Sequence, residues 1–204
     1  MAGSLYSLPK MNITQAIMLL HHKTSLQSST TDQTTVWANL DGVWAKDEKI
    51  GYKMINARAE TLSEKPSFRK PLVSKRCIIP ADSFYEWKRL DPKTKIPMRI
   101  KLKSSNLFAF AGLYEKWNTP QGNPLYTCTI ITTKPNELME DIHDRMPVIL
   151  TDENEKEWLN PKNTDLDYLQ SLLQPYDPND MKAYQVSSLV NSPKNNSPEL
   201  IESH

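Results

Sequence analysis

The sequence predicts an α+β fold with a mainly antiparallel, barrel-like β-sheet surrounded by helices. Most segments with a regular apolar pattern are short and rich in β-branched and aromatic residues, which is typical of strands. Helix-like segments lie between some of them. Residues 118–124, "NTPQGNP", have the Pro and Gly chemistry of a turn between two apolar segments, which predicts a hairpin.

The strands are predicted from alternation or from continuous apolar runs. "RCIIPADSFYEWKR" contains two short apolar runs separated by Pro80-Ala81-Asp82, so we expect a strand, a turn and a strand. "IPMRIKLK" alternates and predicts a half-exposed strand. "NLFAFAGLYEKW" and "LYTCTIITT" predict the two buried strands of the hairpin, and "VIL" and "KAYQVSSLV" predict two later strands.

Three helices are predicted from their capping residues. Asn136 is a good N-cap for "ELMEDIH", and Pro147 ends any helix there. "TDENEKEWL" opens with Thr151 or Asp152 as cap and has acidic residues in its first turn. "DLDYLQSLLQ" predicts a third helix.

We expect residues 1–204 to form a single domain with irregular ends. Residues 1–36 are interpreted as irregular, with "SLQSSTTDQTT" as a mobile loop. Residues 190–204 are interpreted as a Pro/Asn/Ser tail that lies over the surface. "AIMLL" is too short for a membrane helix of about 18 apolar residues or for a secretory signal, so no membrane partner is expected.

Cysteine usage indicates a reducing compartment, so we expect a cytoplasmic protein. Cys77 and Cys128 are the two cysteines, and no C-x-x-C pair is present, which argues against a disulfide framework or a zinc knuckle. His21 and His22 have no further ligand at metal-binding spacing. No metal and no cofactor are therefore expected. The motifs of serine hydrolases, P-loop proteins and zinc proteases are also absent from the sequence.

Charge is unevenly distributed along a chain whose formal net charge is +1. Residues 44–76 contain nine Lys and Arg against four Asp and Glu, whereas residues 135–180 contain three against twelve. The basic stretch is consistent with a phosphate-binding face, although a solvated charged surface is the more ordinary interpretation.

Three groups of polar residues are candidates for chemistry. Asn56, Arg58 and Glu60 alternate with apolar or small residues, which puts them on one face if the segment is extended; the alternative is a turn that leads into the next helix. Glu86 lies inside the aromatic strand "DSFYEWK", where it is either solvent-facing or held with a raised pKa that suits proton transfer.

His143, in "IHDRMPVIL", is the third candidate. An ordinary histidine titrates near pH 6.5 and can act as an acid or a base, with Asp144 or Asp141 to orient it. The alternative is a surface histidine that interacts favourably with the C-terminus of a helix. The residues alone therefore predict an α+β domain with an Asn/Glu/His set and a basic segment, and no assigned reaction.

Five segments in order resemble the SOS response-associated peptidase (SRAP) family: "WAKDEKIGYKMINARAETL", "KRCIIPADSFYEWKR", "FAFAGLYEKW", "TCTIITTKPNELMEDIHDRMPVIL" and "VNSPKNNSPELI". The resemblance implies a barrel-like α+β fold and recognition of abasic sites in single-stranded DNA. In the family, the cysteine after the initiator methionine forms a thiazolidine crosslink with the ring-opened sugar once the methionine has been removed.

Site residues follow from the same resemblance. It implies that Asn56 positions the N-terminal residue and the sugar, that Glu86 manages the proton on the amine, and that His143 acts as general acid/base. It further implies DNA contacts by the aromatic and basic or hydroxyl side chains of Trp44, Arg58, Thr132 and Arg145, where Trp44 would stack beside an unpaired base.

The chain departs from the family pattern at its start, so residues 1–36 are interpreted as divergent or truncated. Ala2 stands at the position of the nucleophilic cysteine, and Ser4 replaces an arginine. Ala2 offers an amine but no thiol, so we expect at most Schiff-base and lyase chemistry. The alternatives are a crippled, non-catalytic module that binds single-stranded DNA and, ranked last, a peptidase that acts on other proteins. We expect a monomer that is nucleoid-associated when bound to DNA.

Overall fold

In the computed structural model, residues 15–21, 33–39, 56–118, 122, 124–192 and 194–204 are described. Their elements in chain order are β1 (Gln15–His21), β2 (Gln33–Asn39), β3 (Asn56–Arg58), η1 (Ala59–Thr61), α2 (Pro66–Ser74), β4 (Arg76–Ala81), β5 (Phe84–Arg89), β6 (Lys95–Leu102), β7 (Phe108–Asn118), β8 (Pro124–Thr133), α3 (Glu137–Glu140), β9 (Met146–Pro147), β10 (Ile149–Leu150), α4 (Asp152–Leu159), α5 (Leu166–Ser171), η2 (Pro178–Asp180), β11 (Met181–Gln185), η3 (Ser188–Asn191) and η4 (Pro198–Ile201).

The main sheet closes into a ring, which confirms the predicted barrel-like fold. Its eight strands follow the order β10-β7-β4-β1-β2-β8-β3, with β9 on β8, and β7 also pairs with β8. The pairings around the ring are antiparallel except for β2 with β8, and β3 also joins β8 in parallel. The predicted hairpin is therefore the β7–β8 pair.

Gly112 of β7 lies close to its neighbours on β4 and β8. It is paired with Cys77 on β4 and with Ile130 on β8. A Cβ atom at Gly112 would lie 2.8 Å from Ile79 Cδ1 and 3.2 Å from the Thr129 carbonyl oxygen, so a larger residue would force these strands apart.

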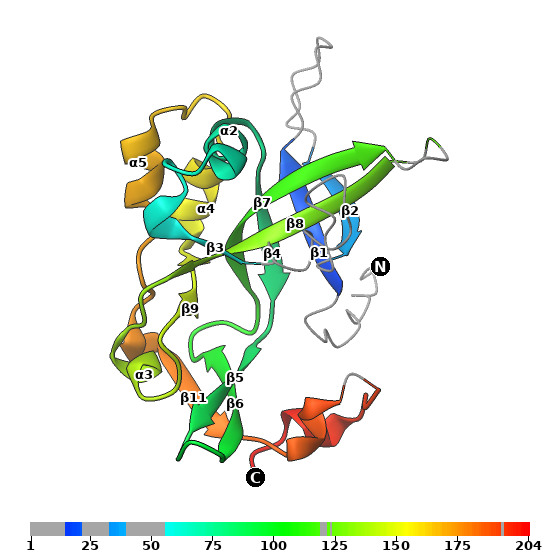
Figure 1. The fold of residues 1–204 in the computed structure, drawn as a ribbon, viewed down its shortest axis with the longest axis vertical. Coiled ribbons are helices and arrows are strands. Elements are labelled where there is room, and N and C mark those ends of the chain that lie inside the picture. The colour runs from blue at the N-terminus through cyan, green and yellow to red at the C-terminus, as the bar shows by residue number, and fades with distance from the viewer. Residues whose placement is uncertain (1–14, 22–32, 40–55, 119–121, 123, 193) are drawn as a thin grey trace, which may run out of the picture.

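A second sheet of three strands, in the order β11-β6-β5, carries the chain segments nearest to the C-terminus (Figure 1). All its pairings are antiparallel. Side chains alternate across it, so Glu86 projects from the opposite face to Tyr85 and Trp87. The C-terminal segment lies on the Tyr85 side, because the Tyr85 hydroxyl donates to the Leu200 carbonyl at 3.1 Å and Leu200 is buried.

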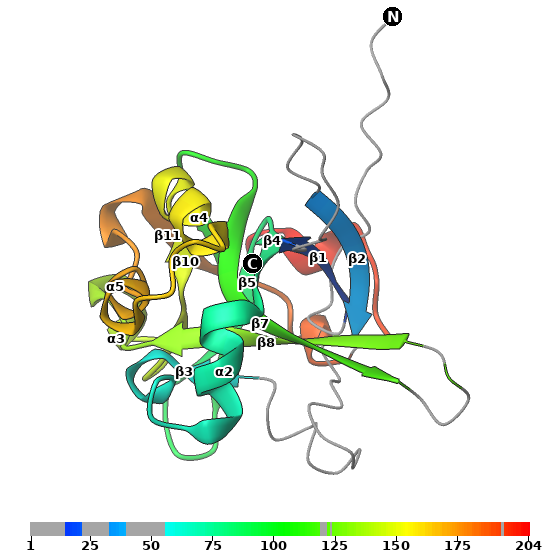
Figure 2. The ribbon, with the colours of Figure 1, turned by 90° about the horizontal axis from the view of Figure 1, so that it is seen from above.

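Helices α2, α4 and α5 gather on one side of the main sheet, away from β1 and β2 (Figures 1 and 2). The apolar core between them and the sheet includes Leu72, Trp158 and Leu169, which are all fully buried. The caps agree with the predicted helix starts: Asn136 accepts from the Met139 N–H, and Thr151, rather than Asp152, caps α4 by accepting from the Asn154 N–H. Among the described residues, no helix has the length and apolar character needed to span a membrane.

Two predictions about the ends of the chain need correction. Residues 1–36 are not irregular throughout, because β1 and the start of β2 lie within them, and β1 pairs with both β2 and β4. The short apolar run 16–20 is a strand that requires partners distant in the sequence. The other correction concerns "KAYQVSSLV", in which the strand ends at Gln185 and η3 follows. The proposed mobile loop lies mostly outside the described residues.

Candidate active site and DNA interface

Glu86 is held in the middle of β5, between Tyr85 and Trp87 and opposite Met98 on β6. Its side chain is 22% exposed, so it is neither a solvent-facing carboxylate nor fully enclosed. Phe84, two residues before it on the same face, is buried in the core. The strand therefore runs from the core outward and leaves Glu86 at the boundary with solvent.

His143 lies in the turn that follows α3, with a side chain that is 42% exposed. Its backbone N–H donates to the Met139 carbonyl at 2.8 Å, which ties the turn to the helix. The Arg145 backbone N–H donates to His143 Nδ1 at 3.1 Å. His143 Nδ1 also lies 3.2 Å from the Arg145 carbonyl oxygen, so the backbone of Arg145 holds this edge of the ring.

The two side chains face each other across the gap between β5 and the α3 turn. His143 Nε2 lies 3.9 Å from Glu86 Oε2, beyond hydrogen-bond reach but within ion-pair distance. On the other edge of the ring, Nδ1 lies 3.2 Å from Asp144 Oδ1. The structure thus selects Asp144 as the carboxylate beside His143. Two acidic side chains, Glu86 and Asp144, therefore flank the ring.

Burial raises the pKa of Glu86, since a carboxylate loses hydration where it is partly enclosed. The attraction of His143 lowers the pKa and opposes this effect, while the charge of Asp144 raises it. A carboxyl with a raised pKa beside an imidazole can exchange a proton with a substrate near neutral pH. The pair is therefore suited to general acid/base chemistry.

Arg145 connects this pair to the main sheet. Its guanidinium donates to both carboxylate oxygens of Glu60 at 2.8 Å, and Nη2 also donates to the Thr132 carbonyl at 2.6 Å. The hydrogen bonds from Arg145 are the main reason that the pKa of Glu60 is lowered. A bidentate pair of this kind fixes geometry as well as charge. The side chain of Arg145 is thus already engaged, and only part of its fork is left for a phosphate.

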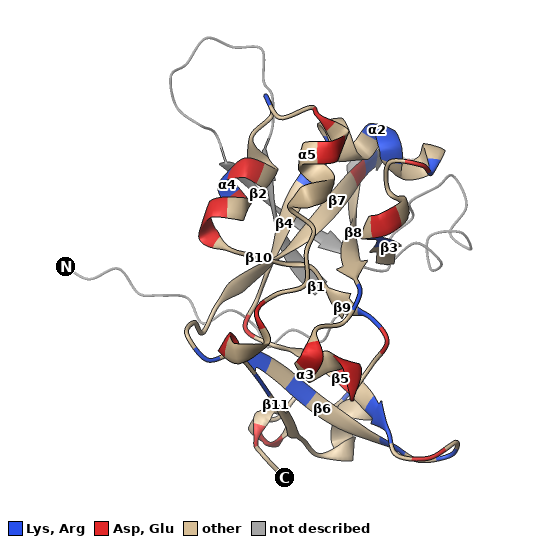
Figure 3. Ribbon diagram, turned by 90° about the vertical axis from the view of Figure 1, so that its left-hand side faces the viewer, with Lys and Arg blue, Asp and Glu red and all other residues tan. Residues whose placement is uncertain are grey.

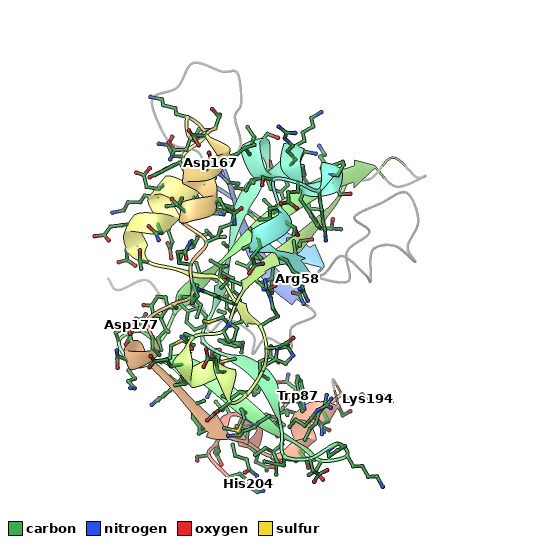
Figure 4. The ribbon with its side chains drawn as sticks, turned by 60° about the vertical axis from the view of Figure 1, so that its left-hand side comes forward. Arg58, Trp87, Asp167, Asp177, Lys194 and His204 are labelled. Carbon is green, nitrogen blue, oxygen red and sulfur yellow. The ribbon has the colours of Figure 1, made fainter. Side chains whose placement is uncertain are left out.

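Arg58 and Asn56 are exposed residues of β3, one on each side of the buried Ala57. Arg58 is paired with Thr132 of β8, and Thr132 is paired with Pro147 of β9, so these residues form one row across three strands. Within the described part of the chain, no hydrogen bond or ion pair holds the Arg58 guanidinium, and its charge helps to lower the pKa of Glu60. Figure 4 shows Arg58 between the helical end of the molecule and Trp87 on the second sheet.

The predicted residues are brought together in two directly linked groups. Glu86 and His143 form one group, and Arg58, Thr132 and Arg145 meet around the β3–β8–β9 row. The His143–Arg145 hydrogen bond joins the groups. Asn56 belongs to the same strand as Arg58, but no contact places it at the Glu86–His143 pair. Ala2 and Trp44 lie outside the described residues.

The basic segment 44–76 is not one continuous phosphate-binding face in its described part. Lys75 pairs with Glu115, and Arg76 is buried. Helix α2 lies at the opposite end of the long axis from β5, and the neighbouring helices α4 and α5 are rich in acidic residues (Figure 3). The cations of α2 are therefore remote from Glu86.

Neither cysteine can act as an exposed nucleophile. Cys77 and Cys128 are both buried and unpaired. Burial raises the pKa of the Cys77 thiol and raises that of Cys128 to about 12, so neither forms a thiolate readily. Among the described residues, no group of three or more His, Cys, Asp or Glu side chains is arranged to hold a metal ion.

Glu60 was recognised in the sequence only as part of an alternating face. Its role as the bidentate partner of Arg145 depends on a turn, η1, that brings residue 60 to residue 145. No spacing rule predicts that contact. The alternation itself is confirmed, because Asn56, Arg58 and Glu60 are all exposed while Ala57 and Ala59 are buried.

Replacing Glu86 with glutamine is expected to raise the melting temperature at neutral pH. The pKa of Glu86 is higher in the folded protein than its ordinary value of about 4.5. The resulting contribution to stability is therefore fully present below pH 4.5 and is lost as the pH rises through the folded-state pKa. Glutamine has no such loss, so the difference in melting temperature between E86Q and the unmodified protein should be larger at pH 8 than at about pH 4. Glu140→Gln, at an exposed position of α3, is the control. A fall in the E86Q melting temperature as the pH rises, relative to the parent, would contradict the assignment.

Comparison with known proteins identifies relatives over most of the chain. The sequence profile of the family described as "SOS response associated peptidase (SRAP)" matches residues 7–193. The abasic site processing protein YoqW of Bacillus subtilis is 97% identical over 161 residues, which cover 79% of this chain and 72% of that protein. The abasic site processing protein HMCES of Xenopus tropicalis is 31% identical over 216 residues, or 95% of this chain and 64% of that protein.

Solved structures agree with these sequence matches. A crystal structure of a protein from Bacteroides thetaiotaomicron has a TM-score of 0.76 and 35% identity, and the match covers 92% of this chain and 80% of that one. A crystal structure of a protein from Bordetella bronchiseptica, with a TM-score of 0.68, 22% identity and coverage of 89% of this chain and 86% of that one, shares the fold. The profile match and the closely similar relatives together show that the chain belongs to the SOS response-associated peptidase family.

Proposed function

We propose that this protein recognises abasic sites in single-stranded DNA and reacts with the ring-opened sugar aldehyde through its N-terminal amine. The observation that carries the proposal is the Glu86–His143 pair, with Nε2 and Oε2 3.9 Å apart, which Arg145 links to Thr132 in the row that includes Arg58. The sugar ring must first open to the aldehyde, and the aldehyde and the amine then condense with loss of water. Ring opening and condensation both need a positioned acid/base. The names of the relatives, which are abasic site processing proteins, support the same substrate.

In this proposal His143 protonates the ring oxygen of the sugar as the C1′–O4′ bond breaks, and the C1′ hydroxyl releases its proton to water to give the aldehyde. Glu86 takes a proton from the ammonium of the N-terminal residue. Arg58 binds a phosphate next to the lesion, with Thr132 beside it. Asn56 positions the sugar, Trp44 stacks on a neighbouring base, and the part of the Arg145 fork that Glu60 leaves free serves as a second phosphate donor. The protein acts as one domain and as a monomer, in the cytoplasm and on the nucleoid.

Residue 2 determines which adduct forms. In this proposal Ala2, after removal of Met1, supplies an amine without a thiol, so the adduct stops at an imine that is open to β-elimination, which cleaves the strand. A cysteine at this position would add its thiol to the imine carbon and close a thiazolidine. Cys77 and Cys128 cannot replace it, because they are buried and because the thiol and the amine must belong to one residue.

Ala2→Cys is expected to convert a labile adduct into a heat-stable one. The unmodified protein, Ala2→Cys and the matched control Ala2→Ser are incubated with single-stranded DNA that carries one abasic site, with and without borohydride. We expect a heat-stable adduct without borohydride for Ala2→Cys alone, and borohydride-trapped adducts for all three. Mass spectrometry of each protein checks that Met1 has been removed.

The absence of any adduct or strand cleavage in all three proteins would reject catalysis. A second function, DNA binding without chemistry, is favoured by Ala2 itself. It predicts affinity for single-stranded DNA that falls with salt and is weakened by Arg58→Ala, with no adduct under either condition. Cleavage of other proteins ranks last, because no protease triad is visible in the sequence.

A further inference from the structure

The strand that carries Glu86 continues into a projecting β-hairpin with an unusual charge content. We call residues 88–95, "KRLDPKTK", the basic arm. It contains four cationic residues and one acidic residue, and it connects β5 with β6. Arg89, Lys93 and Lys95 are exposed, and Leu90 near the tip is 57% exposed.

The single acidic residue of the arm does not neutralise these cations. Asp91 Oδ1 accepts from the backbone N–H groups of Lys93 and Thr94, both at 2.8 Å, and so closes the turn. Within the described part of the chain, no ion pair or side-chain hydrogen bond holds Lys88, Arg89 or Lys95. The arm therefore presents its positive charge to solvent.

Two of its cations are placed directly opposite each other. The register pairs Arg89 of β5 with Lys95 of β6, so both side chains lie on one face of the hairpin. Like charges in directly opposite positions destabilise a sheet. Among the described residues, neither Arg89 nor Lys95 forms an ion pair with an acidic side chain, and an external anion between the two would relieve their repulsion.

The arm adjoins the candidate active site through Lys88, whereas Arg89 and Lys95 project from the face that carries Tyr85 and Trp87. Lys88 follows Glu86 by two residues on the same strand and therefore projects from the same face. The charge of Lys95 lowers the pKa of Glu86 and opposes the effect of burial, so the electric field of the arm acts at the carboxylate. Leu90 is four residues beyond Glu86, which at about 3.4 Å per residue places the tip roughly 14 Å further along.

We propose that the basic arm binds the phosphate backbone of the DNA strand on one side of the abasic site, with Leu90 against a sugar or base. This rests on the proposed function, because the arm extends from the same strand as Glu86. Phosphates supply the anion that the Arg89–Lys95 pair lacks, and apolar side chains among cations commonly contact sugars and bases. The partner is thus the flank of the same strand.

The test neutralises two arm residues and leaves Lys88 and Lys95 in place, because Lys95 acts on Glu86. Arg89→Gln/Lys93→Gln is compared with Arg69→Gln/Lys70→Gln, which removes two exposed cations from α2 at the far end of the molecule. Affinity for abasic single-stranded DNA is measured over a range of salt concentrations. We expect the slope of log affinity against log salt to fall by about 1.4 for the arm variant and to stay unchanged for the α2 variant.

Two further measurements separate binding from folding. Arg89→Gln removes the like-charged pair, so its melting temperature should be equal to or above that of the parent. Arg89→Lys/Lys93→Arg keeps both charges and should keep the salt slope. Two DNA strands, one with the abasic site near its 5′ end and one with it near its 3′ end, then show which flank of the lesion the arm contacts. The arm variant should lose affinity for only one of these two strands.

An unchanged salt slope in the arm variant would overturn the proposal. An equal loss of salt slope in the charge-preserving variant would also overturn it, and so would an equal loss of affinity for both lesion-end strands. These results differ from failure of the proposed function, in which the unmodified protein itself does not bind or react with the abasic strand.

Discussion

Replacing His143 with alanine is expected to slow formation of the borohydride-trapped adduct with abasic DNA by about 10²–10⁴-fold. The imidazole lies 3.9 Å from Glu86, and its Nδ1 edge is held by the backbone of Arg145, so the Nε2 edge faces the carboxylate. In the proposed mechanism, the alanine variant keeps the backbone of the turn but lacks the acid that opens the sugar ring. Adduct formation is followed over time in the unmodified chain and in the Ala2→Cys background.

The matched control is His204→Ala, at the exposed end of the chain. Affinity for intact single-stranded DNA should be the same for both variants and the parent, because His143 is assigned to proton transfer rather than to phosphate binding. Equal rates for His143→Ala and the parent would remove the histidine from the mechanism. A loss of DNA affinity that accounts for the whole rate effect would make it a binding residue instead.

Replacing Arg76 with leucine is expected to lower the free energy of unfolding by about 3–5 kcal/mol. This side chain is 6% exposed and donates to the carbonyls of Leu72, Val73, Trp158 and Asn160. These carbonyls belong to the C-terminal ends of α2 and α4, where the helix dipole attracts a cation. Leucine would leave all four groups without a partner.

Thermal or denaturant unfolding measures this effect, with Arg69→Leu on the exposed face of α2 as the control. Arg76→Lys should fall between the two, since a lysine keeps the charge but cannot reach both helix ends at once. Burial lowers the pKa of Arg76 to about 10, so the group remains charged at neutral pH. A change below about 1 kcal/mol for Arg76→Leu would show that water or other donors replace the guanidinium.

The strands from β4 to β8 could be predicted from the sequence because their signals are local. "RCIIPADSFYEWKR" contains both the apolar runs and the turn residues of β4 and β5, and Asn136 marks the start of α3 by its own chemistry. The strand β1 could not be predicted in this way. It pairs Leu20 with Cys77, and nothing in its own short apolar run indicates a partner so far along the chain.

The sequence indicated which residues are candidates for the site, but not the distances and contacts between them. The separation of 57 residues between Glu86 and His143 says nothing about the distance between them, and spacing alone did not distinguish Asp141 from Asp144. Arg145 was expected to meet phosphate, whereas the fold also gives it Glu60 as a bidentate partner. Such contacts depend on how the β3 segment and the α3 turn meet, which is decided by packing.

The closed ring of the main sheet also affects how several copies behave together. In the described part of the chain, the strands outside the ring are short: β3 has three residues, and β9 and β10 have two each. Long open strand edges act as templates for intermolecular pairing and aggregation. The short strands β3, β9 and β10 expose few backbone N–H and C=O groups with which a second copy could form hydrogen bonds. Copies crowded along one heavily damaged DNA strand should therefore stay separate through their main sheets, even at high local concentration.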